Sequence, residues 1–250
     1  MKREVLGKRR LYSFLAKLRA NPGHYVNLYL KPSSFPHRIG ELVAEAGYDV
    51  CAGDIKRSVA NEALVREAEK YRTGAAVFWG ENAGTCIVIP PFPIGDDKIS
   101  VGGLDTSLLY ETLERAYTTG VVLVTWGSYS LGVFEHDSLV DSKTGTGYIH
   151  KEHRKGGMSE KRFARRTEEQ KKDFLRKVSN RIEERFKSCT LDYVFFGGNK
   201  LILKPLLKEC RYLELEVHKI SGRILNIRYA DREALNHSIE EITKSLVFSF

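Results

Sequence analysis

Cysteine is scarce in this sequence, and none of its four cysteines forms a CxxC pair with another. Such scattered positions argue against a disulfide framework and a zinc knuckle, so we expect reduced and mostly buried thiols. Long apolar runs are missing too, because none approaches the roughly 20 residues of a membrane-spanning helix. The first residues lack the apolar core of a signal peptide, and the chain has no repeats and no low-complexity tract. These absences predict a cytoplasmic protein with no membrane partner.

Positive charge, by contrast, is in excess. The 250 residues carry a net charge of +8, which suggests an anionic partner. The segment from Lys151 to Lys187 alone holds 14 lysines and arginines against 7 acidic residues. The ordinary explanation of such a run is the solvated face of a helix. Here, however, the run begins beside the glycine pair Gly156-Gly157.

The hydrophobic pattern predicts a mixed α/β protein of two domains, residues 1–117 and residues 118–250. In the first domain we expect helices over 6–20, 58–71 and 106–117. We also expect a strand over 25–32, a hairpin of 75–80 with 85–90, and a short strand before the last helix. The second domain is expected to open with the strand "GVVLVTWG" and its hairpin partner "SLGVFEHD". The segments "DYVFFGG" and "YLELEVH" and a final helix over 231–246 complete it.

A long helix is expected between these strands, because one stripe of side chains recurs every three or four residues. The stripe consists of Phe163, Thr167, Gln170, Phe174, Val178, Ile182 and Phe186. Ser159 stands where an N-cap residue belongs. Cationic side chains fall off the stripe and are expected to face outward, namely Lys161, Arg162, Arg165, Lys172 and Arg176.

Gly156 and Gly157 are the main candidate site. Glycine adopts positive φ without penalty, so the pair can turn backbone amides toward an anion or a developing oxyanion. A flexible strand-to-helix connection would be the ordinary explanation of two glycines. Cationic flanks favour a protruding, RNA-facing loop instead, and they comprise His150, Lys151, His153, Arg154, Lys155, Lys161, Arg162, Arg165 and Arg166.

Other candidates are weaker. His150 and His153 have no nearby cysteine or carboxylate pattern that would complete a metal site, so we expect neither a metal nor another cofactor. Gly197-Gly198 lacks the P-loop pattern and is expected to be a structural turn. Four acidic residues near predicted strand ends leave a metal-dependent nuclease as a weak third option, and these are Asp105, Asp137, Asp141 and Asp192.

The stretch "HKEHRKGGMSEKRFARRTEEQKKDFLRKVSNRIEERF" resembles the central domain of the archaeal and eukaryotic class-1 peptide chain release factors, where a GGQ loop precedes a similar SxxRFxRxR helix. "VVLVTWGSYSLGVFE" and "LDYVFFGG" are similar to the strands around that loop. "LGKRRLYSFLAKLRANPGHYVNLYLKP" is similar to the family's opening helix and strand, and "AGDIKRSV" falls at its codon-reading NIKS loop. The resemblance is strongest from Gly120 to Phe186.

This resemblance implies an N-terminal α/β release-factor-like domain and an RNase H-like mixed-sheet central domain with a protruding GG loop and a long basic helix. The family's third domain, which docks a GTPase, has no counterpart, so we expect a monomer without a GTPase partner. In the family, the loop enters the peptidyl transferase centre of the large ribosomal subunit and promotes attack by water on the peptidyl-tRNA ester.

Carried over residue by residue, Gly156 and Gly157 would shape the catalytic loop, and the backbone amide of Met158 would donate to the oxyanion. The residues expected to hold ribosomal RNA and tRNA are Lys151, His153, Arg154, Lys155, Lys161, Arg162, Arg165 and Arg166. A degenerate decoding loop would consist of Asp54, Ile55, Lys56 and Arg57.

Three departures from the family pattern matter. Met158 replaces the family's glutamine, Asp54 adds a negative charge to the decoding loop, and "LDTSLLYE" lacks the cysteine of the second decoding motif. Stop-codon reading is therefore not expected. The chain is closest in type to the release-factor-like peptidyl-tRNA hydrolases of ribosome rescue, which vary the GGQ triplet. The alternative is a non-enzymatic factor that binds the ribosome or tRNA through the same loop and helix without hydrolysis.

Overall fold

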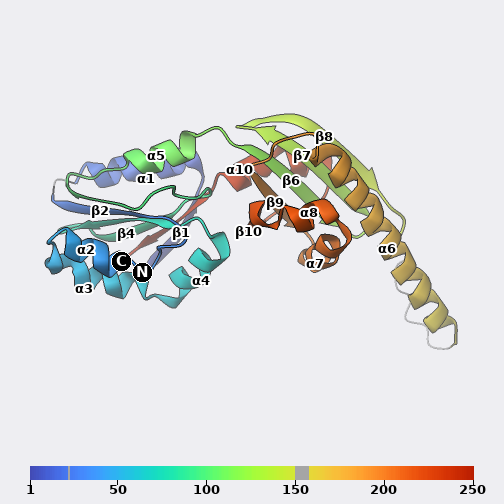
Figure 1. Ribbon diagram of the computed structural model, residues 1–250, viewed down its shortest axis with the longest axis horizontal. Coiled ribbons are helices and arrows are strands. Elements are labelled where there is room, and N and C mark those ends of the chain that lie inside the picture. Colours follow the sequence, from blue (N-terminus) through green and yellow to red (C-terminus); the bar gives the residue numbers. More distant parts are fainter. Residues whose placement is uncertain (22, 150–157) are drawn as a thin grey trace. The chain divides into compact units, whose positions relative to one another are not determined.

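The structure is a computed structural model that describes residues 1–21, 23–149 and 158–250. The chain divides into two compact units, each built around one sheet (Figure 1). Met1–Arg115 and Ile242–Phe250 form the first unit, and Ala116–Glu241 form the second. The mixed α/β character predicted from the sequence is therefore present. Among the described residues, no helix combines the length and the apolar composition that crossing a bilayer requires.

The first unit contains a six-stranded sheet in the order β1-β11-β4-β3-β2-β5, with every neighbouring pair antiparallel. Its strands are β1 (Lys2–Leu6), β2 (Tyr25–Leu30), β3 (Ala75–Gly80), β4 (Gly84–Ile89), β5 (Lys98–Gly102) and β11 (Ser245–Ser249). Its helices are α1 (Lys8–Arg19), α2 (Ile39–Glu45), α3 (Asp49–Val59), α4 (Glu62–Tyr71) and α5 (Ser107–Glu114).

Helices cover both faces of this sheet, which explains why all six residues of β2 are buried. Val26 and Leu28 of β2 pack in one core with residues of α2, α3 and α4. Tyr29 points to the opposite face, where it packs with Leu11 and Leu15 of α1 and with residues of α5. Because side chains alternate along a strand, one strand supplies both cores.

The second unit contains a five-stranded mixed sheet in the order β10-β9-β6-β7-β8. The strands β6 (Thr118–Thr125), β7 (Ser128–Glu135) and β8 (Ser138–Thr146) are antiparallel neighbours, whereas β9 (Tyr193–Gly198) and β10 (Ile220–Leu225) run parallel to β6. Its helical elements are α6 (Met158–Phe186), α7 (Lys200–Glu209), α8 (Arg211–Leu215), η1 (Val217–Lys219), α9 (Arg232–Asn236) and α10 (Ser238–Ile242).

The C-terminal segment departs from the expected division and from the expected helix over residues 231–246. The helix is broken into α9 and α10, and residues from Ser245 onward form β11. This strand lies between β1 and β4 in the first sheet, so residues 242–250 belong to the first unit and not to the predicted domain 118–250. Leu246, Val247 and Phe248 are fully buried there because β11 is an interior strand.

Other elements follow the sequence pattern with shifted ends. The predicted hairpin is formed by β3 and β4, and Gly84 at its turn has φ 72°. The helix expected over 106–117 ends at Glu114, and the helix expected over 58–71 begins only at Glu62, where Asn61 caps it. The strand β8 was not predicted, because its sequence "SLVDSKTGT" is mostly polar, as suits the edge position that it occupies.

Candidate functional site

The C-terminal part of α6 packs on the second sheet. Phe174, Val178, Ile182 and Phe186 of the predicted stripe are all buried, and the last three are completely inaccessible. The ring of Phe174 lies 6.3 Å from that of Trp126 and 6.2 Å from that of Tyr129, measured between centroids. Burying these side chains stabilises the unit by about 1.5–3 kcal/mol each. This part of the helix is therefore a structural anchor.

Polar contacts fix the register of the anchored part. Lys177 Nζ donates to the carbonyl oxygen of Thr146 at 2.8 Å, at the end of β8. Arg185 pairs with Asp141 of β8 at 2.9 Å. Because both contacts join α6 to β8, the anchored part of the helix is held against the strand that precedes the glycine loop.

The N-terminal part of α6 extends beyond the sheet (Figure 1). Residues 162–166 are exposed on every side of the helix, and Phe163 is 55% exposed. Thr167, at 4% exposure, is the first described side chain that the unit buries. From Thr167 back to Met158 the helix rises about 14 Å, at 1.5 Å per residue. The start of α6 therefore projects from the unit instead of packing against it.

Two predictions about this part of the helix are wrong. Phe163 belongs to the stripe but is not buried, because the sheet no longer lies beneath the helix at that position. Ser159 was expected to be the N-cap, but the helix begins at Met158, which places Ser159 inside it. Arg162, Arg165, Lys172 and Arg176 do face solvent, as predicted.

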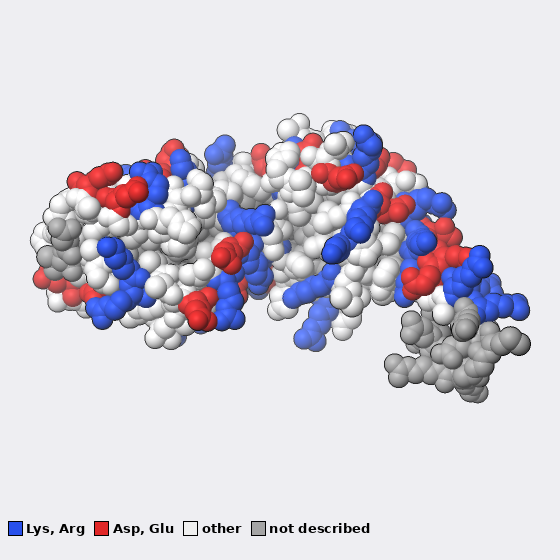
Figure 2. All heavy atoms as spheres, turned by 60° about the horizontal axis from the view of Figure 1, so that its bottom comes forward, with Lys and Arg blue, Asp and Glu red and all other residues white. Residues whose placement is uncertain are grey.

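The projecting part of α6 is positively charged (Figure 2). Arg165 pairs with Glu169 at 3.1 Å, whereas Arg162 and Arg166 have no acidic partner among the described residues. These exposed cations therefore attract an anion. The arrangement suits RNA phosphates.

The glycine loop itself lies outside the described residues. This applies to Lys151, His153, Arg154, Lys155, Gly156 and Gly157, and also to His150. Met158 is described as the first residue of α6. The roles assigned to these residues from the sequence stay predictions, and so does the role of Lys161. What the structure gives is the point of attachment, because Gly157 directly precedes the projecting end of the helix.

The other end of the loop is also fixed to the unit. Gly147 donates its backbone N–H to the carbonyl oxygen of Gly127 at 2.9 Å. A Cβ atom at Gly147 would lie 2.5 Å from Phe174 Cδ2, so the chain passes directly over the anchoring ring. Ile149 packs against the same core. The segment that contains the glycine pair is thus joined to packed structure on its N-terminal side and to the projecting start of α6 on its C-terminal side.

The segment predicted to be a decoding loop is helical, which corrects that expectation. Asp54, Ile55, Lys56 and Arg57 all lie within α3. The physical reason is visible in the sequence, because Cys51, Ile55 and Val59 recur at helical spacing and are buried. Asp54 pairs with Arg57 and accepts a hydrogen bond from Trp79 Nε1 at 3.4 Å. Lys56 is exposed.

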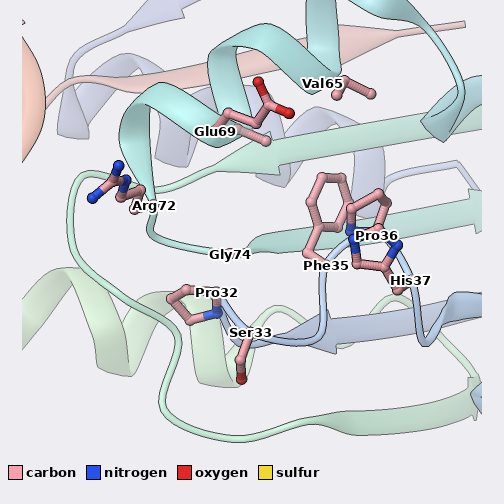
Figure 3. A pocket seen from close by; sticks show the side chains of 10 residues that line it. Pro32, Ser33, Phe35, Pro36, His37, Val65, Glu69, Arg72 and Gly74 are labelled. Carbon is pink, nitrogen blue, oxygen red and sulfur yellow. The ribbon is translucent and has the colours of Figure 1, made fainter.

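A pocket of about 680 Å³ opens in the first unit between α4 and the segment from Pro32 to His37 (Figure 3). Val65, Glu69 and Arg72 face this segment across the pocket. Gly74 lies at its edge, with φ 75°, and a Cβ atom there would be 2.0 Å from the carbonyl oxygen of Leu30. The pocket combines apolar walls with one acidic and one basic side chain, and the sequence did not single it out.

The four acidic residues considered for a nuclease do not come together. Asp105, in the first unit, accepts hydrogen bonds from Ser107 and pairs with Lys98, and these contacts lower its pKa to about 2. In the second unit, Asp141 pairs with Arg185, and Asp192 accepts from the Thr118 N–H at 2.8 Å. Asp137 lies 3.4 Å from His136. Within the described part of the chain, no group of three or more metal-ligating side chains is assembled.

Gly197-Gly198 forms the structural turn expected from the sequence. Gly198 has φ 93°, and a Cβ atom there would lie 2.2 Å from the carbonyl oxygen of Val124. Asn199 follows as the N-cap of α7 and accepts from the Leu201 N–H. Only glycine fits this close approach between β9 and β6.

A second pocket, of about 380 Å³, lies in the second unit and was also missed from the sequence. It is lined by Thr125, Ser128, Thr144, Gly145, Thr146, Tyr229, Ala230, Asp231 and Arg232. These residues come from separate segments, so no local pattern marks the whole site. The basic and aromatic run "RYADR" was the one local signal that could have indicated part of it.

Comparison with known proteins gives one family match. A family model described as the Actinobacteria/chloroflexi VLRF1 release factor matches residues 117–247, which is slightly more than half of the chain. None of the curated proteins matches. The matched residues include β6, β7, β8, the glycine pair, α6 and the second pocket.

Several solved structures resemble the chain at low identity. Archaeal translation termination factor aRF1 is 17% identical, with a TM-score of 0.38 over 95% of this chain and 73% of that chain. An archaeal protein is also 17% identical, with a TM-score of 0.35 over 93% and 69% of the two chains. Pelota from Archaeoglobus fulgidus is 8% identical, with a TM-score of 0.32 over 96% and 63%.

Proposed function

Because the chain belongs to the Actinobacteria/chloroflexi VLRF1 release factor family, we propose that it is a ribosome-associated peptidyl-tRNA hydrolase. It frees nascent peptides from stalled ribosomes or large subunits without reading a stop codon. Membership of a release factor family implies an interaction with the ribosome. The observation that carries the proposal is the projecting, cationic end of α6, to which Gly156-Gly157 is directly attached.

The proposed chemistry is hydrolysis of the ester between the peptide and the terminal ribose of tRNA. A water oxygen attacks the ester carbonyl, the bond to the ribose oxygen breaks, and that oxygen leaves with a proton. The backbone N–H of Met158 donates to the developing oxyanion, and one such donor is typically worth about 3–4 kcal/mol. The thioether of Met158 supplies no comparable donor. The reaction therefore depends on the backbone and on the geometry of Gly156 and Gly157.

Binding of RNA is assigned to the cations around the loop. Arg162, Arg165 and Arg166 are exposed at the projecting end, and Lys151, Arg154 and Lys155 precede the glycine pair in the sequence. Contacts from arginine and lysine to phosphates give affinity that falls with salt. The roughly 14 Å over which α6 projects lets this end enter a confined RNA site without bringing the second sheet with it.

Two further observations support the proposal. The second sheet has three antiparallel strands followed by two strands parallel to the first, which is the arrangement expected of an RNase H-like central domain. In the first unit, Asp54 is engaged with Arg57 and Trp79, and Ile55 is buried. Lys56 and Arg57 are exposed, but Asp54 and Ile55 are poorly placed to read a codon, which favours release without decoding.

The proposal is tested by peptide release from large subunits that carry labelled peptidyl-tRNA and no messenger RNA. We expect the wild-type protein to release peptide above the rate in buffer. Gly157→Val should abolish release, because a β-branched side chain restricts the backbone of the loop, while co-sedimentation with the subunits stays nearly unchanged. Gly7→Val is a matched control, since Gly7 has open space around its Cβ position.

The second candidate function is a ribosome-binding factor without hydrolytic activity. It is favoured by one observation, which is Met158 at the position where release factors carry glutamine. Under this alternative, wild-type protein co-sediments with large subunits but shows no release above buffer. The same release assay therefore decides between the two functions.

A further inference from the structure

We propose that the 380 Å³ pocket of the second unit binds one unpaired nucleotide of an RNA strand, as a contact separate from the glycine loop. The pocket lies where β6 and β8 end and β7 begins. Thr125 is paired with Ser128, and Ser128 is paired with Thr146, so the three hydroxyl side chains come from neighbouring strands in register. Thr144 adds a fourth hydroxyl to the lining.

The lining is polar, open and well supported. Thr125 Oγ1 and Ser128 Oγ lie 2.6 Å apart, so these hydroxyls fix each other. Gly145 leaves its part of the wall without a side chain, because a Cβ atom there would lie 2.4 Å from the hydroxyl oxygen of Tyr129. A surface of short hydroxyl side chains can hydrogen-bond the edges of a base or a ribose.

Tyr229 supplies an aromatic wall. It is 71% exposed, and no ring of the described residues packs on it. A large aromatic side chain left in water beside a polar pocket is typical of a stacking platform for an unpaired base. Arg228 precedes it and is also exposed, so the aromatic ring is accompanied by a cation.

Asp231 and Arg232 are suited to the ribose and the phosphate of a ribonucleotide. Asp231 Oδ1 accepts from the Ala234 N–H at 2.8 Å, which caps α9, whereas Oδ2 has no partner among the described residues. That oxygen can accept from a ribose 2′-hydroxyl, the group that distinguishes RNA from DNA. Arg232 donates one N–H to Ser142 and retains further donors for a phosphate.

The position of the pocket excludes the tRNA nucleotide that carries the peptide ester. Thr146, in its lining, accepts from Lys177 of α6. From Lys177 back to Met158 the helix rises about 28 Å, at 1.5 Å per residue. A nucleotide in the pocket is therefore too far from the start of α6 to be the one that carries the peptide ester. The pocket holds another RNA segment, and this assignment of the strand rests on the proposed function.

The test measures binding of short fluorescent single-stranded RNA to the full chain, with DNA of the same sequence and free adenosine monophosphate as separate arms. We expect RNA to bind more tightly than DNA and free nucleotide. Tyr229→Ala should weaken RNA binding about tenfold, because one base–aromatic stack is lost. Tyr229→Phe keeps the ring and should stay within about twofold of wild type.

Asp231→Asn tests the ribose contact. Asparagine preserves the N-cap acceptor for Ala234, so α9 remains capped. We expect the preference for RNA over DNA to fall, with little change in DNA binding. Equal affinity of Tyr229→Ala and wild type for RNA, or an unchanged RNA preference in Asp231→Asn, would overturn the proposal. Tighter binding of the free nucleotide than of the strand would assign the pocket to a mononucleotide and contradict it as well.

These outcomes are distinguishable from failure of the proposed function, because oligonucleotide binding requires neither ribosomes nor hydrolysis. If wild-type protein releases peptide but Tyr229→Ala binds RNA normally, the pocket assignment alone is wrong. If Tyr229→Ala loses RNA affinity while wild type releases no peptide, the pocket stands and the hydrolase does not.

Discussion

The exposure of single side chains distinguishes the anchored part of α6 from its projecting part. Phe174 and Phe163 lie on the same stripe of the same helix, at 3% and 55% exposure. We expect Phe174→Ala to lower the free energy of unfolding of the second unit by about 3–5 kcal/mol, because it removes a buried ring and leaves a cavity. Phe163→Ala should change it by less than about 0.5 kcal/mol. Thermal unfolding of both variants measures the difference.

The two substitutions are matched controls for each other, since residue type, helix and stripe are the same. Similar destabilisation by both would mean that the start of α6 is packed in solution. That result would contradict the projection on which the proposed function depends.

The lowered pKa of Asp105 predicts that the stability of the first unit depends on pH. Its hydrogen bonds from Ser107 and its pairing with Lys98 lower its pKa to about 2. A carboxylate with a lowered pKa contributes stability that is complete above the ordinary value of about 3.9 and is lost as the pH falls toward 2. We expect Asp105→Asn to be less stable than wild type at pH 6.

The difference in melting temperature between Asp105→Asn and wild type should shrink between pH 4 and pH 2, because wild type then loses the charge that the variant lacks. Asp137→Asn is a suitable control, since Asp137 is exposed and has no comparable set of contacts. A constant difference across this pH range would show that the charge of Asp105 does not stabilise the fold.

At the scale of elements, the charge of α6 predicts how its two parts contribute to ribosome binding. Reversing Arg162 and Arg165 to glutamate should weaken association with large subunits and flatten its dependence on salt, because fewer counterions are released. Reversing Lys172 and Arg176 makes the same change of charge in the anchored part. We expect this control to have the smaller effect on sedimentation with subunits at a series of salt concentrations.

If both double variants bind like wild type at every salt concentration, α6 does not contact RNA. If the control weakens binding more than Arg162→Glu/Arg165→Glu, the interface lies over the anchored part of the helix. Either result would contradict the assignment of the projecting end.

The elements also show what the sequence could predict. The apolar stripe located α6 from Phe174 to Phe186, because that part has a sheet to pack on. The stripe could not show that burial stops before Phe163, since the helix sequence holds no information on where the sheet ends. Helix α3 was missed for a different reason. The helical spacing of Cys51, Ile55 and Val59 indicates this helix, whereas the resemblance to the family's decoding loop predicts a loop at the same residues.

At the scale of the whole molecule, the boundary near residue 117 was predictable and the return of the C-terminus was not. The change from α5 to the apolar strand β6 marks the boundary in the local sequence. The strand β11, in contrast, is placed by its pairing with β1 and β4, which are distant in the sequence. The two pockets share this property, because each is assembled from segments that only the fold brings together.

The proposed mechanism requires that the backbone amide at position 158 suffices for hydrolysis when the loop is held on a projecting helix. The decisive comparison is the rate of peptide release from large subunits by wild type and by Met158→Gln. We expect wild type to release peptide at a rate within about tenfold of the variant. A gain of about 100- to 1,000-fold in Met158→Gln, the effect of adding one required oxyanion donor, would contradict it.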